Sequence, residues 1–128
     1  IWRHGPWSLQ GEWLGIAARR DAGLADGRAQ GGYLQGSWML SGETKPYKRG
    51  ALANPRPQHP GGAVELAARW STLRIDAPAT PLDRQSNWAR GLNWYVGTHM
   101  KLMANYVDVD SRAARDPDLV ELRIQLML

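Results

Sequence analysis

VELRIQLML (120–128) alternates between apolar and polar side chains from Val120 to Leu126. Successive side chains of an extended strand point to opposite faces. The even-numbered residues of this stretch, through Leu128, are all apolar and would share one face, whereas residues 121, 123 and 125 are polar and would share the other. The stretch therefore predicts a β-strand with one apolar face and one polar face.

Five further stretches show the same alternation with a period of two residues. The connections between them are rich in Gly, Pro and Asp, which favour turns. The sequence therefore predicts an all-β fold, an antiparallel meander of six strands. The five stretches are SLQGEWL (8–14), YLQGSWML (33–40), AVELAARWST (63–72), WARGLNWYV (88–96) and KLMANYVDV (101–109).

One connection is unusually long. ETKPYKRGALANPRPQHPGG (43–62) has twenty residues, four of them proline. Proline cannot donate a hydrogen bond to a central strand, so we expect no strand here. We expect instead a surface loop with no chemistry of its own, although loops of this length are often functional.

Composition excludes several classes of protein. The 128 residues fit one domain, and the absence of cysteine excludes disulfides and thiolate metal sites. No stretch approaches the roughly 18 apolar residues of a membrane helix. The net charge of +4 is spread over turns and loops rather than clustered on one face, so we expect no nucleic-acid binding. The chain begins IWRHGPW, with neither an initiator methionine nor a signal peptide, so we expect it to be a piece of a longer protein.

No arrangement of residues indicates catalysis. The histidines His4, His59 and His99 are far apart and lack ligand spacing, and there is no G-x-S-x-G elbow or glycine-rich phosphate loop. DVDSRAARDPD (108–118) begins like a calcium loop but has Arg112 where a third ligand should stand. We expect no enzyme activity, no cofactor and no metal.

Alternation alone does not distinguish a sheet in water from one in lipid, because a half-buried soluble sheet also alternates. Two features favour a membrane barrel. Tryptophan and tyrosine lie near the strand ends, as in aromatic girdles, and most strands have the 8–11 residues that a tilted strand needs to cross a bilayer. A soluble β-sandwich that binds carbohydrate through exposed tryptophans is the alternative.

The order of several motifs resembles one family. GPWSLQGEW, YLQGSWMLSGETKPY, AVELAARWSTL and NWARGLNWYVGTHMKLMANYVDVD, followed by VELRIQLML, resemble the C-terminal part of the phosphate-selective porins O and P. The resemblance runs from about Gly5 to Leu128. It implies a trimeric, sixteen-stranded outer-membrane barrel of a Gram-negative bacterium that passes phosphate or related anions. Residues 1–128 would then be the C-terminal fragment of a single barrel domain, its last six strands. A general porin or receptor barrel without anion preference is a further alternative.

The resemblance also orients the chain. Loops 21–30, 76–87 and 111–118 would face the outside, and the turn at 97–100 and the long 43–62 loop would face the periplasm. Arg90 would lie on the lipid-facing side, where it must reach the membrane surface, contact another subunit or mark a bulge.

Charged residues on the predicted polar face are candidates for lining the pore. Both signs occur, and the three cations could attract anions. The alternative is that the cations are paired with Glu65 and Glu121 as ordinary wall residues. The candidates are Glu12, Glu65, Arg69, Lys101, Glu121 and Arg123.

Overall fold

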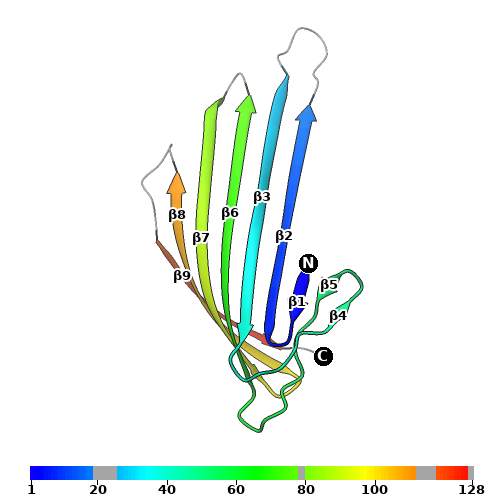
Figure 1. Cartoon of the computed structure of the whole chain (residues 1–128). Coiled ribbons are helices and arrows are strands. Elements are labelled where there is room, and N and C mark those ends of the chain that lie inside the picture. The colour runs from blue at the N-terminus through cyan, green and yellow to red at the C-terminus, as the bar shows by residue number, and fades with distance from the viewer. Residues whose placement is uncertain (19–25, 78–79, 112–117, 127–128) are drawn as a thin grey trace.

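The protein forms one long, curved antiparallel sheet (Figure 1). The computed structural model describes residues 1–18, 26–77, 80–111 and 118–126. Seven strands pair in the order β1-β2-β3-β6-β7-β8-β9, so each strand lies beside its neighbour in sequence apart from a short hairpin, β4-β5. The strands are β1 Trp2–His4, β2 Trp7–Ala18, β3 Gly27–Met39, β4 Tyr47–Lys48, β5 Ala51–Leu52, β6 Ala63–Ala77, β7 Thr80–Val96, β8 Met100–Ser111 and β9 Leu119–Leu126.

The predicted meander is confirmed, and the register between its strands agrees with the predicted faces. Trp70 lies opposite Leu34 on one side and Trp88 on the other, whereas Glu65 lies opposite Asn93. The alternating residues of all six predicted strands therefore fall on two consistent faces. We call the face that carries Leu66 and Trp70 the apolar face and the face that carries Glu65 and Arg69 the polar face.

The apolar face is not covered by any described part of the chain. Leu66, Leu92 and Trp94 are exposed on it, and Leu122 is 79% exposed. Only one large sheet is present among the described residues, so no second layer packs on this face as it would in a sandwich. No helix in the described part of the chain is long and apolar enough to cross a membrane.

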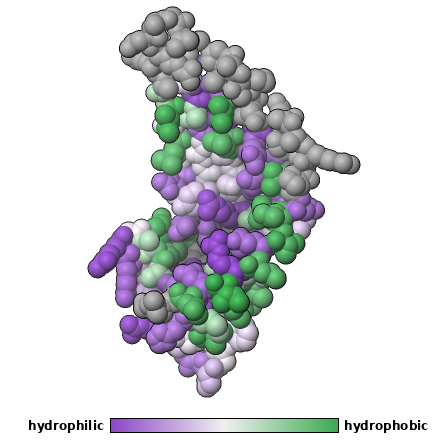
Figure 2. Space-filling view, turned by 180° about the vertical axis from the view of Figure 1, so that it is seen from behind, coloured by the Kyte–Doolittle hydropathy of each residue, from purple (hydrophilic) through white to green (hydrophobic). Residues whose placement is uncertain are grey.

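Toward the end of the sheet at which β2 ends and β3 begins, apolar side chains lie on the polar face and charged side chains lie on the apolar face. Leu14, Ile16 and Leu73 lie on the same side as Glu12, and the arginines Arg74 and Arg84 oppose one another on the other side. Figure 2 shows hydrophilic residues across the middle of the sheet and hydrophobic residues above them. The apolar face is therefore a bounded band that ends in a row of charge.

The strands differ from the predicted ranges in several places. β1 was not predicted; it pairs with β2 through Trp2 and Leu9 across a turn at residues 5–6. The expected loop at 76–87 is too long, because β6 runs to Ala77 and β7 begins at Thr80. The expected loop at 21–30 is too long, since β3 begins at Gly27. Backbone pairing with a neighbouring strand extends these strands through polar sequence, and no local pattern reveals it.

Arg90 does not mark a bulge. The β6–β7 register is continuous from Ala63 to Ile75, with Arg90 opposite Ala68, and shifts only between Ile75 and Ala77. Arg90 is exposed on the apolar face. Of the three explanations for this residue, the bulge is therefore wrong.

Residues 40–62, which we call the connecting loop, join β3 to β6 and contain the β4-β5 hairpin. The expectation that no strand forms here is wrong. Arg49 and Gly50 both adopt positive φ, 50° and 84°, as a tight two-residue hairpin turn requires. In Figure 1 the hairpin lies at the end of the sheet where β1 turns into β2.

Candidate functional site

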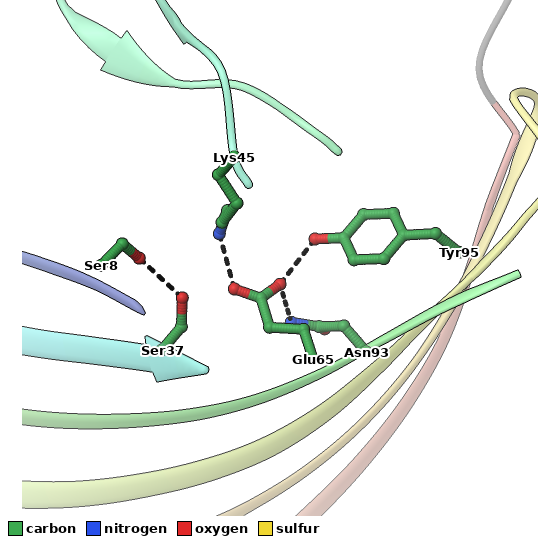
Figure 3. Close-up of polar contacts among 6 residues, drawn as sticks. All are labelled: Ser8, Ser37, Lys45, Glu65, Asn93 and Tyr95. Carbon is green, nitrogen blue, oxygen red and sulfur yellow. Dashed lines mark hydrogen bonds and ion pairs between the residues drawn. The ribbon is translucent and has the colours of Figure 1, made fainter. Parts of the chain in front are cut away.

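The most elaborate polar cluster lies where the connecting loop meets the polar face (Figure 3). Glu65 is only 1% exposed although it is charged. Lys45 Nζ lies 2.6 Å from Glu65 Oε1, and Glu65 Oε2 accepts hydrogen bonds from the Tyr95 hydroxyl at 2.6 Å and from Asn93 Nδ2 at 3.1 Å. Both carboxylate oxygens are therefore satisfied.

Strand register explains why three of these groups meet. Asn93 in β7 lies directly opposite Glu65 in β6, and Tyr95 lies two residues further along on the same face. Lys45 comes instead from the connecting loop. A buried carboxylate is stable only when it is paired and hydrogen-bonded, so Glu65 requires a cation that its own sheet does not place against it. Removing one partner of such a pair costs roughly 3–5 kcal/mol.

The buried apolar cluster lies at the same place. Met39, Ala63 and Tyr95 are the buried hydrophobic residues of the described chain, and all three belong to the polar face. Nearby, Ser8 Oγ and Ser37 Oγ lie 2.7 Å apart, joining β2 to β3 (Figure 3). The connecting loop therefore meets the polar face where the buried side chains of the sheet gather, and the ion pair of Lys45 with Glu65 joins the two.

Glu43 fastens the ends of the connecting loop to one another. Its carboxylate accepts hydrogen bonds from the Ser41 hydroxyl and, at 3.2 Å, from the Gln58 amide, and the Val64 amide donates to Ser41 Oγ at 3.0 Å. Burial alone would raise the pKa of Glu43, but these hydrogen bonds and the charge of His59 together lower it by more. The net pKa therefore lies below the ordinary value of 4.5, and Glu43 is ionised at neutral pH.

All six predicted candidates lie on the polar face, but they do not form one cluster. The Arg69 guanidinium lies 4.1 Å from the centre of the Tyr33 ring, and Lys101 Nζ lies 4.9 Å from that of Tyr95. Both are cation–π contacts. Glu12 is exposed and lies opposite Tyr33.

The last two candidates pair with each other. Arg123 Nη2 lies 2.7 Å from Glu121 Oε1, and Asn105 Nδ2 donates to Glu121 Oε2 at 3.4 Å. Of the three candidate cations, Arg123 therefore forms an ion pair with one of the two glutamates. Within the described residues, Arg69 and Lys101 make no ion pair.

Lys45 could not be identified from the sequence, because a loop has no periodicity from which to predict where its side chains point. The contacts of Tyr95 and Asn93 were not predicted either, although alternation along β7 places both on the face of Glu65 and the register brings Asn93 opposite it. No group of three or more His, Asp or Glu residues that could hold a metal occurs in the described part of the chain. Most of the calcium-like stretch lies outside it, at residues 112–117.

Comparison with known proteins gives a consistent result. The model of the family phosphate-selective porin O and P matches residues 1–128. Porin O of Pseudomonas aeruginosa is 29% identical over 119 residues, which cover 83% of this chain and 27% of that protein. An uncharacterized protein of Caulobacter vibrioides is 28% identical over 116 residues, 83% of this chain and 24% of that protein. The chain thus spans about a quarter of the length of these two relatives.

Proposed function

The chain belongs to the phosphate-selective porin O and P family, and from this premise we propose that the whole protein is a passive outer-membrane channel for inorganic anions such as phosphate or polyphosphate. In this proposal the solute gradient drives transport, with no catalysis and no cofactor. Residues 1–128 contribute the C-terminal part of a single barrel, sixteen-stranded when complete, in a Gram-negative outer membrane. The connecting loop lies on the periplasmic side.

The observation that carries the proposal is the bounded apolar band on one face of a single sheet. From Trp88 to Val96 the apolar face of β7 spans eight residue steps, about 27 Å along the strand. At the usual tilt of barrel strands this is roughly 20 Å along the membrane normal, close to the ~25 Å band of known barrels. The row of Arg74 and Arg84 would then stand at the membrane surface.

The polar face supplies the argument for anions. Arg69 and Lys101 have no ion pair among the described residues, whereas Glu65 is neutralised by Lys45 and Glu121 by Arg123. Fixed positive charge that is not neutralised by the wall raises the local concentration of anions. We therefore assign anion contact to Arg69 and Lys101 first, and treat Arg123, Glu65, Glu121 and Glu12 as further pore-lining residues.

Planar-bilayer recording from the full-length protein tests this function. In a salt gradient, the current should reverse near the equilibrium potential of the anion, and phosphate should compete with chloride. Reversal near zero would indicate a general porin without anion preference. If the protein stays in the aqueous fraction without detergent, the barrel itself is wrong.

The family resemblance further leads us to propose a homotrimer. Arg90 allows the trimer to be tested. A cation on the lipid-facing side of a barrel costs about 2–4 kcal/mol at the bilayer midplane and much less near the surface, so a subunit contact would explain its position. Arg90 lies in a hollow of about 900 Å³ that is also lined by Ala68, Ala104 and Tyr106. In R90L, loss of the trimer on semi-native gels would place Arg90 at a subunit contact, whereas an unchanged trimer would show that it reaches the membrane surface.

A further inference from the structure

We propose that Glu65 is a positioning residue: by holding Lys45 it keeps the connecting loop against the polar face, and so narrows the open cross-section of the pore. The inference rests on the proposed channel function and adds to it a named loop and the group that anchors it.

The contacts of the connecting loop concentrate at a few positions. Close to the sheet, Ser41 and Glu43 fasten its first residues and Trp94 Nε1 donates to the Gly61 carbonyl at 2.8 Å. Two residues after Glu43, Lys45 makes two contacts: its ammonium pairs with Glu65, and its carbonyl accepts a hydrogen bond from Arg3 Nη1 at 2.9 Å. Lys45 is therefore the last residue held to the sheet before the hairpin.

Beyond Lys45 the loop projects from its anchor. Tyr47 is 51% exposed, and Lys48, Arg49 and Gly50 are exposed as well. Within the described residues the hairpin forms no hydrogen bond or ion pair to the sheet, and its own closing bond runs from the Ala53 amide to the Pro46 carbonyl at 2.8 Å. On the side of the hairpin that leads from β3, the loop is therefore held to the sheet through Lys45, and on the returning side Gln58 is tied to Glu43.

The groups around Glu65 make this attachment specific. Tyr95 and Asn93 donate to one carboxylate oxygen, and Lys45 pairs with the other. Lys101 lies against the ring of Tyr95, one of the two residues that donate to Glu65. With the charge of Glu65 removed, Lys45 would lose its partner while the positive charge of Lys101 still acts on it, and this repulsion would drive the loop away from the wall.

Two single substitutions separate loop release from a simple change of wall charge. In the full-length protein, E65Q removes a negative charge and K45M removes a positive one, so a purely electrostatic effect on ion selectivity would have opposite signs. Release of the loop predicts the same sign in both: higher single-channel conductance in potassium chloride, more open-channel noise, and admission of larger neutral polymers.

Trypsin provides a second measurement, because Lys48 and Arg49 remain in both variants. Cleavage there should accelerate by about tenfold or more, since proteolysis follows the population of the open form. E121Q is the matched control: it removes a carboxylate from the same face, at a pair that does not touch the loop. It should alter selectivity but leave the cleavage rate at that of the parent.

The outcomes separate this inference from the proposed function. If E65Q and K45M both leave conductance and cleavage at the parent values, Glu65 does not position the loop, even if the parent is anion-selective. If both variants raise conductance and cleavage while the parent shows no anion preference, the positioning role of Glu65 is supported and the proposed anion selectivity is contradicted. Should either single variant fail to reach the folded form, the double variant E65Q/K45M decides, because it removes the attachment without leaving a charged, unpaired carboxylate buried at position 65.

Discussion

Gly62 shows how strongly a single position can constrain the polar face. Its φ is +86°, and a Cβ added there would lie 2.2 Å from the Tyr95 carbonyl oxygen. G62A should therefore destabilise the folded protein by roughly 2–5 kcal/mol, from the left-handed backbone and the collision with β7 together. Urea titration measures the change as a shift in the unfolding midpoint, followed on a gel by the band of the folded protein, whose migration changes on heating. G61A is the control: a Cβ at Gly61 meets nothing within 4 Å, so its midpoint should match the parent. Equal midpoints for the two variants would contradict this account.

Glu43 gives the connecting loop a dependence on pH. Because its folded pKa lies below 4.5, its contribution to stability is present above the unfolded pKa and is lost as the pH falls through the folded value. Hydrogen exchange of the amides near Gln58, corrected for intrinsic rates, should show protection at pH 6 that weakens below about pH 4. In E43Q, which keeps Glu65 and His59, protection should be low at both pH values. Equal protection in parent and E43Q would show that Glu43 does not fasten the loop.

The residues of the candidate site could be predicted only in part. Alternation placed Glu65, Arg69 and Lys101 on one face, because a period of two is a local property of an extended chain. It could not show that Glu65 is buried, since that burial comes from Lys45 and the loop twenty residues earlier in the chain. The sequence does not show where a loop without periodicity directs its side chains.

Strand β9 tests the faces at the level of the element. Glu121, Arg123 and Gln125 lie opposite Asn105, Met103 and Lys101, so they share the polar face. Cysteine at positions 121, 123 and 125 of the intact protein should react with a water-soluble maleimide, whereas cysteine at 122, 124 and 126 should not. A slip of one residue would exchange the two sets and place Arg123 in hydrocarbon, at the cost given above for Arg90. Labelling of the even positions would overturn the register and the pore-lining residues with it. The predicted lipid contact of Leu128 lies outside the described residues.

Other elements show where local pattern fails. The six predicted strands exist because their alternation matches the register, but β6 and β7 continue through Asp76, Pro81 and Asp83, which read as a turn. Each extends because the other supplies a partner, as in the pair of Ile75 and Asp83. β1 has only three residues and is defined by its pairing with β2, so its own sequence could not reveal it.

At the scale of the whole molecule, the described sheet is open at both sides. β1 pairs only with Trp7, Ser8 and Leu9 of β2, so the rest of that strand has no partner on this side among the described residues. β9 likewise pairs only with β8. An open edge presents unpaired backbone groups, each of which costs several kcal/mol in lipid, and known barrels close with at least eight strands.

Residues 1–128 expressed alone should therefore aggregate in buffer or require detergent. Two surfaces drive this: the open edges, which can pair with other copies, and the apolar face, on which Leu122, Ile124 and Leu126 are all more than 70% exposed. Size-exclusion chromatography with light scattering, with and without detergent, measures the outcome. The full-length protein in the same detergent is the control and should migrate as a folded, heat-modifiable species, because in the proposed barrel further strands would pair with both edges. A monomeric fragment that melts cooperatively in plain buffer would mean that the two edges meet or are covered within these residues, and the barrel proposal would lose its premise that this sheet is completed by the rest of the protein.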